Sequence, residues 1–272
     1  MSDLCFLAAL GTTVLACMLY LVFFVSQNAR VRVVARSVLL LSGILQTLYI
    51  GSRYALAGYT PMTSEHEAVV FFAWAVTWGY LSFRWRYTVK NFGTFVAWLI
   101  LALLIAAALV SREILPLTPS LKSWWLPVHA GVSLLAYAFF GLAFCGGLMY
   151  LLQERELKRK KFGYFYERLP SLEALDQLNS HCLTTGFVFL TLGIVTGSLW
   201  TRQTTGLYWQ WHPKEIWSMV NWLVYLLQIH QRFTAGWRGR RAAVMAIAGF
   251  MVVIFTLWGV IYPLGGEQSY GQ

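Results

Sequence analysis

The chain has 272 residues, of which 58% are hydrophobic and 12% charged, and its formal net charge at pH 7 is +10. Soluble domains average about 25% charged residues, so this composition excludes an ordinary soluble protein and indicates a multispanning membrane protein. The basic residues lie in short loops between apolar segments and form no Arg-rich stripe. This pattern excludes a nucleic-acid-binding domain and points to orientation in a bilayer.

Eight apolar segments have about the length that a transmembrane helix needs, which is about 20 residues. The expected spans are residues 4–25, 35–52, 68–83, 92–110, 126–152, 182–200, 215–231 and 243–262, of which the third and seventh are short or interrupted by polar residues. Lipid offers no hydrogen-bond partner to an exposed backbone, so these segments should be helical. The sequence predicts an all-α polytopic membrane protein of about eight transmembrane helices, with residues 1–272 as one membrane domain.

The expected spans place the 21 lysines and arginines in two unequal sets of loops. One set holds sixteen: Arg30, Arg32, Arg36, Arg84, Arg86, Lys90, Arg155, Lys158, Arg159, Lys160, Lys161, Arg168, Arg232, Arg238, Arg240 and Arg241. The other holds five: Arg53, Arg112, Lys122, Arg202 and Lys214. The positive-inside rule predicts that the richer set faces the cytoplasm, which puts both termini outside. The longest internal loop, about residues 153–181, is polar and should form a short amphipathic helix on the inner surface.

The cysteines suggest packing rather than chemistry. Cys5, Cys17, Cys145 and Cys182 lie in or beside apolar segments, and none belongs to a C-x-x-C pair. They should pack as small apolar side chains. Without C-x-x-C-H the chain is not expected to be a c-type cytochrome itself, and its apolar N-terminus is expected to be a retained span rather than a cleaved signal.

Residues 200–217 form the most unusual loop, with the sequence WTRQTTGLYWQWHPKEIW. Its last ten residues hold the aromatic and charged side chains Tyr208, Trp209, Trp211, His212, Lys214, Glu215 and Trp217. Rigid aromatic surface beside charged groups suits a large, planar, mostly apolar ligand with charged edges, of which haem is the obvious example. The alternative is that these rings only anchor the loop at the membrane interface.

The five histidines differ in how well they suit haem-iron ligation, which is a common role of imidazole. His129 and His230 lie at span ends beside apolar residues, and intramembrane ionisable groups tend to mark functional sites. His212 lies in the aromatic loop. His66 and His181 gain least from this reasoning, and each of the five also fits the plain interpretation of a polar residue at the headgroup level.

The run G-L-Y-W-Q-W-H-P-K-E-I-W-S resembles the tryptophan-rich signature of the cytochrome c assembly family, W-G-x-Y-W-x-W-D-P-K-E-T-W. This haem-handling family includes the CcsA/ResC, CcmC, CcmF and HemX-like proteins. Similar stretches are T-L-G-I-V-T-G-S-L-W before the signature, W-L-V-Y-L-L-Q-I-H-Q-R after it, and L-P-V-H-A-G-V-S-L-L-A-Y-A earlier in the chain. The resemblance covers about residues 60–272 and identifies 200–217 as an outer haem-binding loop.

The resemblance implies a haem-binding protein that exports haem or presents it at the outer face of the bacterial cytoplasmic membrane for cytochrome c maturation. The implied cofactor is a non-covalent, b-type haem. The implied cofactor-binding residues are His129, His212, His230, Tyr208, Trp209, Trp211, Lys214 and Trp217, and the implied iron ligands are the three histidines. In the CcsA/ResC branch the implied partners are a ResB/Ccs1-type membrane protein and an apocytochrome c, and the chain would be one component of a cytochrome c haem lyase (synthase).

Two departures from the family pattern bear on the iron ligands. The family aspartate of W-D-P-K-E is His212 here, and the second external histidine, in G-x-H-S-Y, is Gln268. Three possibilities remain open: His212 (favoured) or His66 replaces the missing ligand, the iron has one strong ligand, or the chain is a diverged paralogue. Lys214, with Arg53 or Arg202, is expected to pair with the haem propionates, and Glu215 either orients Lys214 or caps the following helix.

Two other functions fit the same residues. A HemX-like paralogue would affect haem biosynthesis through an upstream enzyme. A b-type electron-transfer cytochrome would hold an outer haem on His129 and an inner one on His181 and His230. No catalytic residue is assigned, because no serine, cysteine or carboxylate dyad suggests hydrolysis and no glycine loop suggests ATP use.

Overall fold

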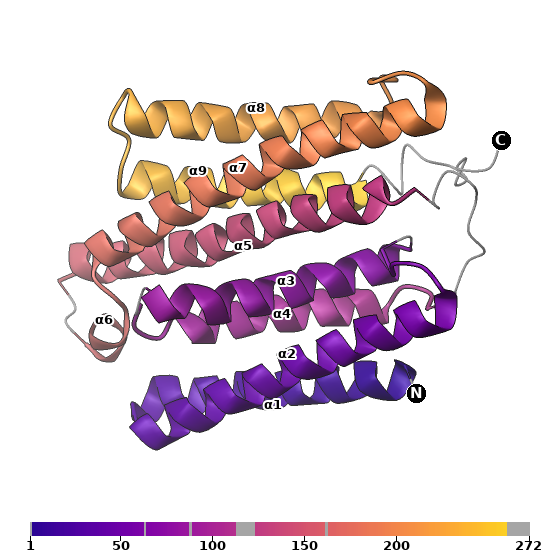
Figure 1. Ribbon diagram of the computed structural model, residues 1–272. Helices are drawn as coiled ribbons and strands as arrows, with labels where there is room; N and C mark the ends of the chain where they lie inside the picture. Colours follow the sequence, from indigo (N-terminus) through magenta and orange to yellow (C-terminus); the bar gives the residue numbers. More distant parts are fainter. Residues whose placement is uncertain (1, 63, 87–88, 113–122, 161–162, 260–272) are drawn as a thin grey trace.

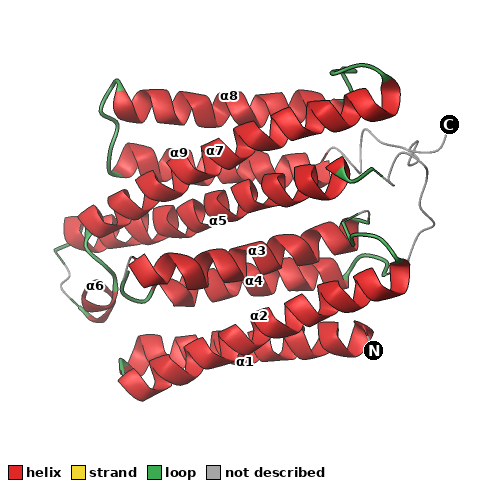
Figure 2. Ribbon diagram, viewed as in Figure 1, coloured by secondary structure: helices red, strands yellow, loops and turns green. Residues whose placement is uncertain are grey.

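The computed structural model describes residues 2–62, 64–86, 89–112, 123–160 and 163–259, which form a bundle of long helices lying side by side (Figure 1). The helices are α1 (Ser2–Ser26), α2 (Ala29–Ala57), α3 (Glu65–Arg86), α4 (Phe92–Ala108), α5 (Trp125–Lys158), α6 (Tyr164–Arg168), α7 (Leu172–Thr205), α8 (Pro213–Phe233) and α9 (Arg240–Ile254), followed by a π-helical turn, η2 (Phe255–Gly259). Within these ranges there are helices and loops but no strands (Figure 2).

The helices other than α6 correspond to the eight expected spans. Helices α1, α2, α5, α7 and α9 with its following turn are long and apolar enough to cross a membrane, and α4 is a shorter apolar helix. Helices α3 and α8 are the two whose spans the sequence marks as short or polar. The prediction of an all-α, multi-pass membrane protein is confirmed.

The polar segment 153–181 is mostly helical, so the connection is shorter than expected, although a short helix, α6, does lie within it. Helix α5 continues to Lys158 and α7 begins at Leu172, leaving only residues 159–171 between them. An i,i+4 pair between Lys158 and Glu154 (Nζ to Oε1, 2.7 Å) supports the extension of α5. The Ser171 hydroxyl accepts from the Ala174 N–H at 3.2 Å and caps α7. These polar turns extend both helices beyond their apolar stretches.

The bundle has two halves, α1–α4 and α5 with α7–α9, joined where α3 and α4 pack on α5 (Figure 1). Fully buried large side chains fill the core, among them Phe72, Ile100, Leu104, Phe140 and Met149. Large apolar side chains such as Leu7, Leu15 and Val22 are exposed on α1. An apolar exterior around an apolar core is what a lipid environment requires.

Consecutive helices run in opposite directions, so the connections gather at two ends of the bundle (Figure 1). The "loop end" holds the start of α1, the starts of α3 and α5, and the α7–α8 connection. The "basic end" holds the α1–α2 and α8–α9 connections and α6. Most of the described lysines and arginines of the richer set lie at the basic end, so the charge sorting expected from the sequence separates the two ends of the molecule.

Candidate functional site

The aromatic loop is a tight connection between two long helices at the loop end. Helix α7 ends at Gly206, whose φ of 81° is the left-handed conformation that favours glycine, and its N–H donates to the Arg202 carbonyl. Helix α8 begins at Pro213, where a proline has no helical N–H to lose. The few residues between them carry most of the aromatic signature.

Glu215 holds the start of α8. Its carboxylate accepts from the backbone N–H groups of Gln210 at 2.8 Å and His212 at 3.3 Å, and from the Thr201 hydroxyl at 3.4 Å. His212 is the N-cap, and its Nδ1 accepts from the Lys214 N–H at 3.5 Å. Of the two roles expected for Glu215, these contacts show the capping role, which also fixes where His212 and the tryptophans lie.

The aromatic rings of the signature separate into two groups. Trp209 and Trp211 meet edge to face with centroids 6.0 Å apart, and Trp211 is 75% exposed. The Arg202 guanidinium lies 4.5 Å from the centre of the Tyr208 ring. Trp217 instead packs on Phe255 of η2, with centroids 4.6 Å apart. The exposed aromatic surface therefore belongs to residues 208–211, while Trp217 anchors α8 to the end of α9.

His129 lies in the first turns of α5, facing α7 at the loop end. One ring nitrogen, Nδ1, lies 2.8 Å from the Gly193 carbonyl oxygen. The ring is nearly parallel to that of Trp200, at 16° and 6.2 Å between centroids. A carbonyl only accepts, so Nδ1 carries the proton and Nε2 keeps its lone pair. Within the described part of the chain, Nε2 has no hydrogen-bond partner.

Gly197 makes room for this imidazole. A Cβ at that position would lie 2.7 Å from Cε1 and 2.8 Å from Nδ1 of His129, closer than side-chain atoms approach one another. Gly193, one turn earlier, similarly faces Ser133, whose Oγ would lie 2.5 Å from an added Cβ. Small residues one turn apart let two membrane helices approach closely, and here the approach fixes the orientation of a histidine.

The other histidines lie elsewhere. His230 is exposed in the last turn of α8, about 27 Å along the helix axis from His212. His181 is exposed near the start of α7. His66 is buried, and both of its nitrogens are used: Nδ1 lies 2.8 Å from the Ala107 carbonyl, and Nε2 lies 2.8 Å from the Tyr49 hydroxyl. The structure thus brings His129 and the loop to one end, places His230 at the other, and engages both nitrogens of His66 in hydrogen bonds.

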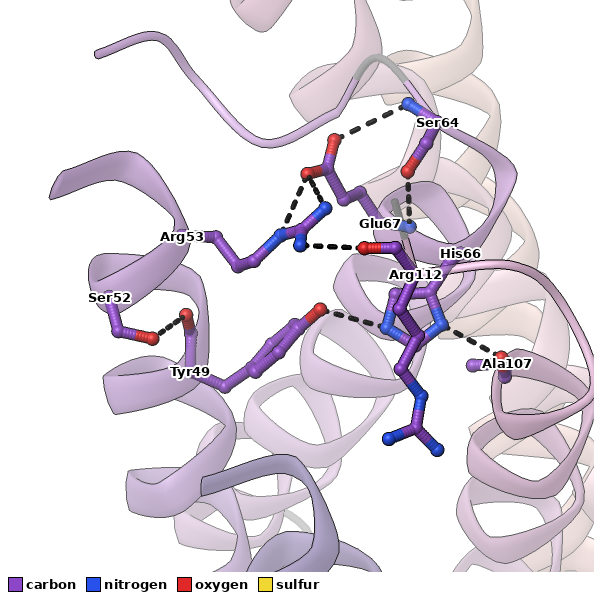
Figure 3. A network of polar contacts seen from close by, with 8 residues as sticks. All are labelled: Tyr49, Ser52, Arg53, Ser64, His66, Glu67, Ala107 and Arg112. Atoms are coloured by element: carbon purple, nitrogen blue, oxygen red, sulfur yellow. Dashed lines mark hydrogen bonds and ion pairs between the residues drawn. The ribbon is translucent and has the colours of Figure 1, made fainter. Parts of the chain in front are cut away.

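A buried polar network at the loop end, which the sequence does not predict, surrounds His66 (Figure 3). Arg53 donates from Nε and Nη2 to one Glu67 carboxylate oxygen at 3.1 and 2.8 Å, and from Nη1 to the Arg112 carbonyl at 2.8 Å. Glu67 also accepts from the Ser64 N–H. The expectation that Arg53 pairs with a haem propionate is not supported, since its three donor nitrogens are engaged. The sequence signal that could have indicated this ion pair is the position of its two charges: Arg53 follows the second apolar segment, and Glu67 precedes the third.

Comparison with known proteins places the chain in a family. The model of the family described as cytochrome C assembly protein matches residues 62–264. The cytochrome c biogenesis protein CcsA of Chlamydomonas reinhardtii is 32% identical over 254 residues, which cover 90% of this chain and 70% of that protein. CcsA of Guillardia theta is 30% identical over 251 residues, covering 85% of this chain and 83% of that protein.

The fold also has a solved relative. The structure of the cytochrome c haem lyase CcmF superposes with a TM-score of 0.66 at 14% identity, covering 94% of this chain and 46% of that chain. The chain therefore shares the fold of somewhat less than half of that protein. With the family match and the apolar helices, these similarities show that the chain belongs to the cytochrome c assembly protein family and is a multi-pass membrane protein of cytochrome c maturation.

Proposed function

We propose that this chain binds haem non-covalently at its loop end and presents it there for attachment to an apocytochrome c, as one component of a haem lyase. The observation that carries the proposal is His129. Its Nδ1 is bound to a backbone carbonyl, and its Nε2 has no partner within the described residues. Metal-ligating histidines usually show this arrangement, in which the second nitrogen fixes the tautomer and the ring orientation.

The aromatic loop at the same end of the bundle carries groups that fit a haem. Trp209 and Trp211 offer apolar ring faces, and the buried Nε1 of Trp209 has no hydrogen-bond partner among the described residues. Arg202 and Lys214 are exposed in the same segment and would pair with propionates. Tyr208 and Trp217 hold Arg202 and the end of α9 in place. Bound haem would supply the vinyl groups to which cysteine thiols of an apocytochrome add.

His212 is our candidate for the second iron ligand. It is exposed at the N-cap of α8, and only its Nδ1 is engaged, at 3.5 Å. Gln268 stands where the family has its second external histidine, and it lies outside the described residues. The second iron ligand must therefore come from another residue or be lacking. His66 is the weaker alternative, because binding iron would break one of its two buried hydrogen bonds.

We further propose that the basic end faces the cytoplasm of a bacterium and that the loop end faces the periplasm. The concentration of basic residues at one end supports this orientation through the positive-inside rule. His230 would then serve an inner haem site, reached before export to the outer one. A ResB/Ccs1-type membrane protein would be the partner in transfer.

A spectrum of the purified protein tests the proposal. Oxidised and dithionite-reduced samples should show the bands of a low-spin, non-covalent haem that acid acetone extracts, and co-expression with a ResB/Ccs1-type protein should yield covalent cytochrome c. Haem without covalent cytochrome would favour the HemX-like paralogue. This paralogue is the second candidate because Gln268 replaces the family's second external histidine. Haem that cycles between redox states without leaving the protein would favour an electron-transfer cytochrome. Protein without haem would contradict all three.

Gly197→Ala should weaken haem binding without removing any ligand. The added methyl group would overlap the His129 ring, so the ring must turn and its Nε2 would no longer point along the same line. We expect at least about a tenfold lower haem affinity, since active groups tolerate only small displacements, measured by titrating haem into the apoprotein. Gly131→Ala is the matched control, because on α5 its Cβ meets only the Met62 methyl at 4.0 Å. Equal affinities in the two variants would show that the position of His129 does not control binding.

A further inference from the structure

Helix α8 carries polar side chains on its buried face and apolar side chains on its exposed face. Its buried residues are Asn221, Tyr225 and Gln228, and Arg232 follows one turn later on the same side. We name these four residues the polar stripe. The exposed apolar residues on the other side are Ile216, Met219, Leu223, Leu226 and Leu227. Lipid satisfies the outer face, whereas the stripe needs hydrogen-bond partners inside the bundle.

Protein groups satisfy the two ends of the stripe. Arg232 donates to both carboxylate oxygens of Asp176, at 3.2 and 2.7 Å, and from Nε to the Ser180 hydroxyl at 2.7 Å. Asn221 donates from Nδ2 to the Thr256 hydroxyl at 2.6 Å. These contacts tie α8 to α7 at the basic end and to η2 nearer the loop end.

Between these ties, three consecutive members of the stripe have buried polar atoms without partners among the described residues. The atoms are Asn221 Oδ1, the Tyr225 hydroxyl and Gln228 Nε2. Rotating the Gln228 amide would exchange an unpaired donor for an unpaired acceptor and would remove neither need. Buried polar groups without a protein partner are uncommon and usually bind ordered water. Three in succession on one helix face indicate a shared aqueous partner.

The structure has an opening for water beside this row. A cavity lies between α7, α8 and α9, with about 10 Å³ of space for the centre of a water molecule, which is room for about one molecule. It is lined by Asn179, Leu183, Gln228, Gln231, Arg232, Trp237, Ala242 and Met245. The cavity thus touches the stripe at Gln228 and Arg232, at the basic end.

The spacing of the stripe also suits water. Gln228 and Tyr225 are about 4.5 Å apart along the helix axis, and Tyr225 and Asn221 about 6 Å. One water molecule that bonds two groups at ordinary hydrogen-bond lengths spans about 5–6 Å. The axial spacing of the three positions is thus of the size that one bridging water spans.

We propose that the polar stripe binds a file of water molecules, which enters beside Arg232 and reaches Asn221. The waters donate to Asn221 Oδ1, exchange hydrogen bonds with the Tyr225 hydroxyl and accept from Gln228 Nε2. The Asn221–Thr256 bond closes the far end, so the file is a blind inlet that brings protons and water from the basic end into the middle of α8. This inference does not depend on haem binding.

Radiolytic hydroxyl-radical labelling of the wild-type protein in detergent tests the inlet, because buried side chains are oxidised mainly where water lies beside them. Tyr225 and Tyr49 are an internal matched pair: both are 1% exposed, but the Tyr49 hydroxyl is paired with His66. Tyr225 should be oxidised at least about ten times faster than Tyr49 if it contacts bound water. Equal rates would overturn the proposal.

Cysteine labelling provides a second, independent measurement. In a background with the four native cysteines replaced by alanine, Asn221→Cys and Gln228→Cys should react with a small neutral methanethiosulfonate. Leu223→Cys and Leu227→Cys, on the lipid face of the same helix, should react at least about tenfold more slowly, since thiols need water to ionise. Only variants that elute as the parent protein does are compared. Faster labelling on the lipid face than on the stripe would refute a hydrated inlet.

Discussion

His129→Ala should lose most of its bound haem while the protein remains folded. The imidazole is the one histidine side chain at the loop end that is oriented by a backbone carbonyl and by a stacked ring, Trp200, with its second nitrogen unengaged among the described residues. Removing it deletes the proposed iron ligand but only one hydrogen bond. The measurement is the haem content of the purified variant and its reduced spectrum, compared with wild type.

Two further variants distinguish ligation from packing. His129→Gly with added imidazole should regain a low-spin spectrum, because the free base can enter the space beside Gly197 and Trp200. His66→Gln should keep its haem, although it loses thermal stability with the Ala107 and Tyr49 contacts. A normal spectrum in His129→Ala, or equal haem loss in His66→Gln, would contradict the ligand assignment.

His212→Ala tests whether His212 or another group is the second iron ligand. If His212 is the second ligand, this variant should bind haem in a high-spin state with a lowered affinity. An unchanged low-spin spectrum would mean that another group supplies the ligand. The variant should still fold, since a side chain at an N-cap contributes about 0.5–2 kcal/mol to stability and Glu215 continues to accept the Gln210 N–H.

The helices and the loop follow from local signals in the sequence. Apolar length predicts the spans, and Gly206 and Pro213 mark where α7 stops and α8 starts. His129 can also be predicted as a site residue from its position at a span end and from the family resemblance. Its hydrogen bond to Gly193 could not be predicted, because it depends on the register of α5 against α7, which no local pattern specifies.

Other features do not follow from the sequence, for physical reasons. The sequence predicts that Arg53 can pair with a propionate, but helix packing buries it against Glu67, and no local pattern indicates that burial. Polarity predicts that the spans end at residues 152 and 182, whereas capping and an i,i+4 pair continue both α5 and α7 beyond them. In the sequence, the polar residues of α8 indicate only an interrupted span. Their spacing of four, three and four residues places them on one face, which is visible only once the helix is known to be buried on that side.

Glu67→Ala should cause the largest loss of stability among substitutions at the loop end. Arg53 is 3% exposed, and two of its three hydrogen-bonding nitrogens donate to Glu67. Removing one partner of a buried ion pair leaves an uncompensated charge and costs about 3–5 kcal/mol. At roughly 2–4 °C per kcal/mol for a chain of this size, the melting temperature in detergent should fall by at least about 6 °C.

The neighbouring carboxylate provides the control. Glu65, in the same first turn of α3, is half-buried, and Glu65→Ala should lose only a favourable helix-end charge worth about 0.3–1 kcal/mol. The double variant Arg53→Met with Glu67→Leu should recover most of the stability lost in Glu67→Ala, because apolar residues of similar volume often replace a buried pair at little cost. If Glu65→Ala and Glu67→Ala melt at the same temperature, the buried pair does not hold this end of the bundle together. If the double variant is as unstable as Glu67→Ala, the loss of stability in Glu67→Ala comes from packing rather than from the uncompensated charge of Arg53.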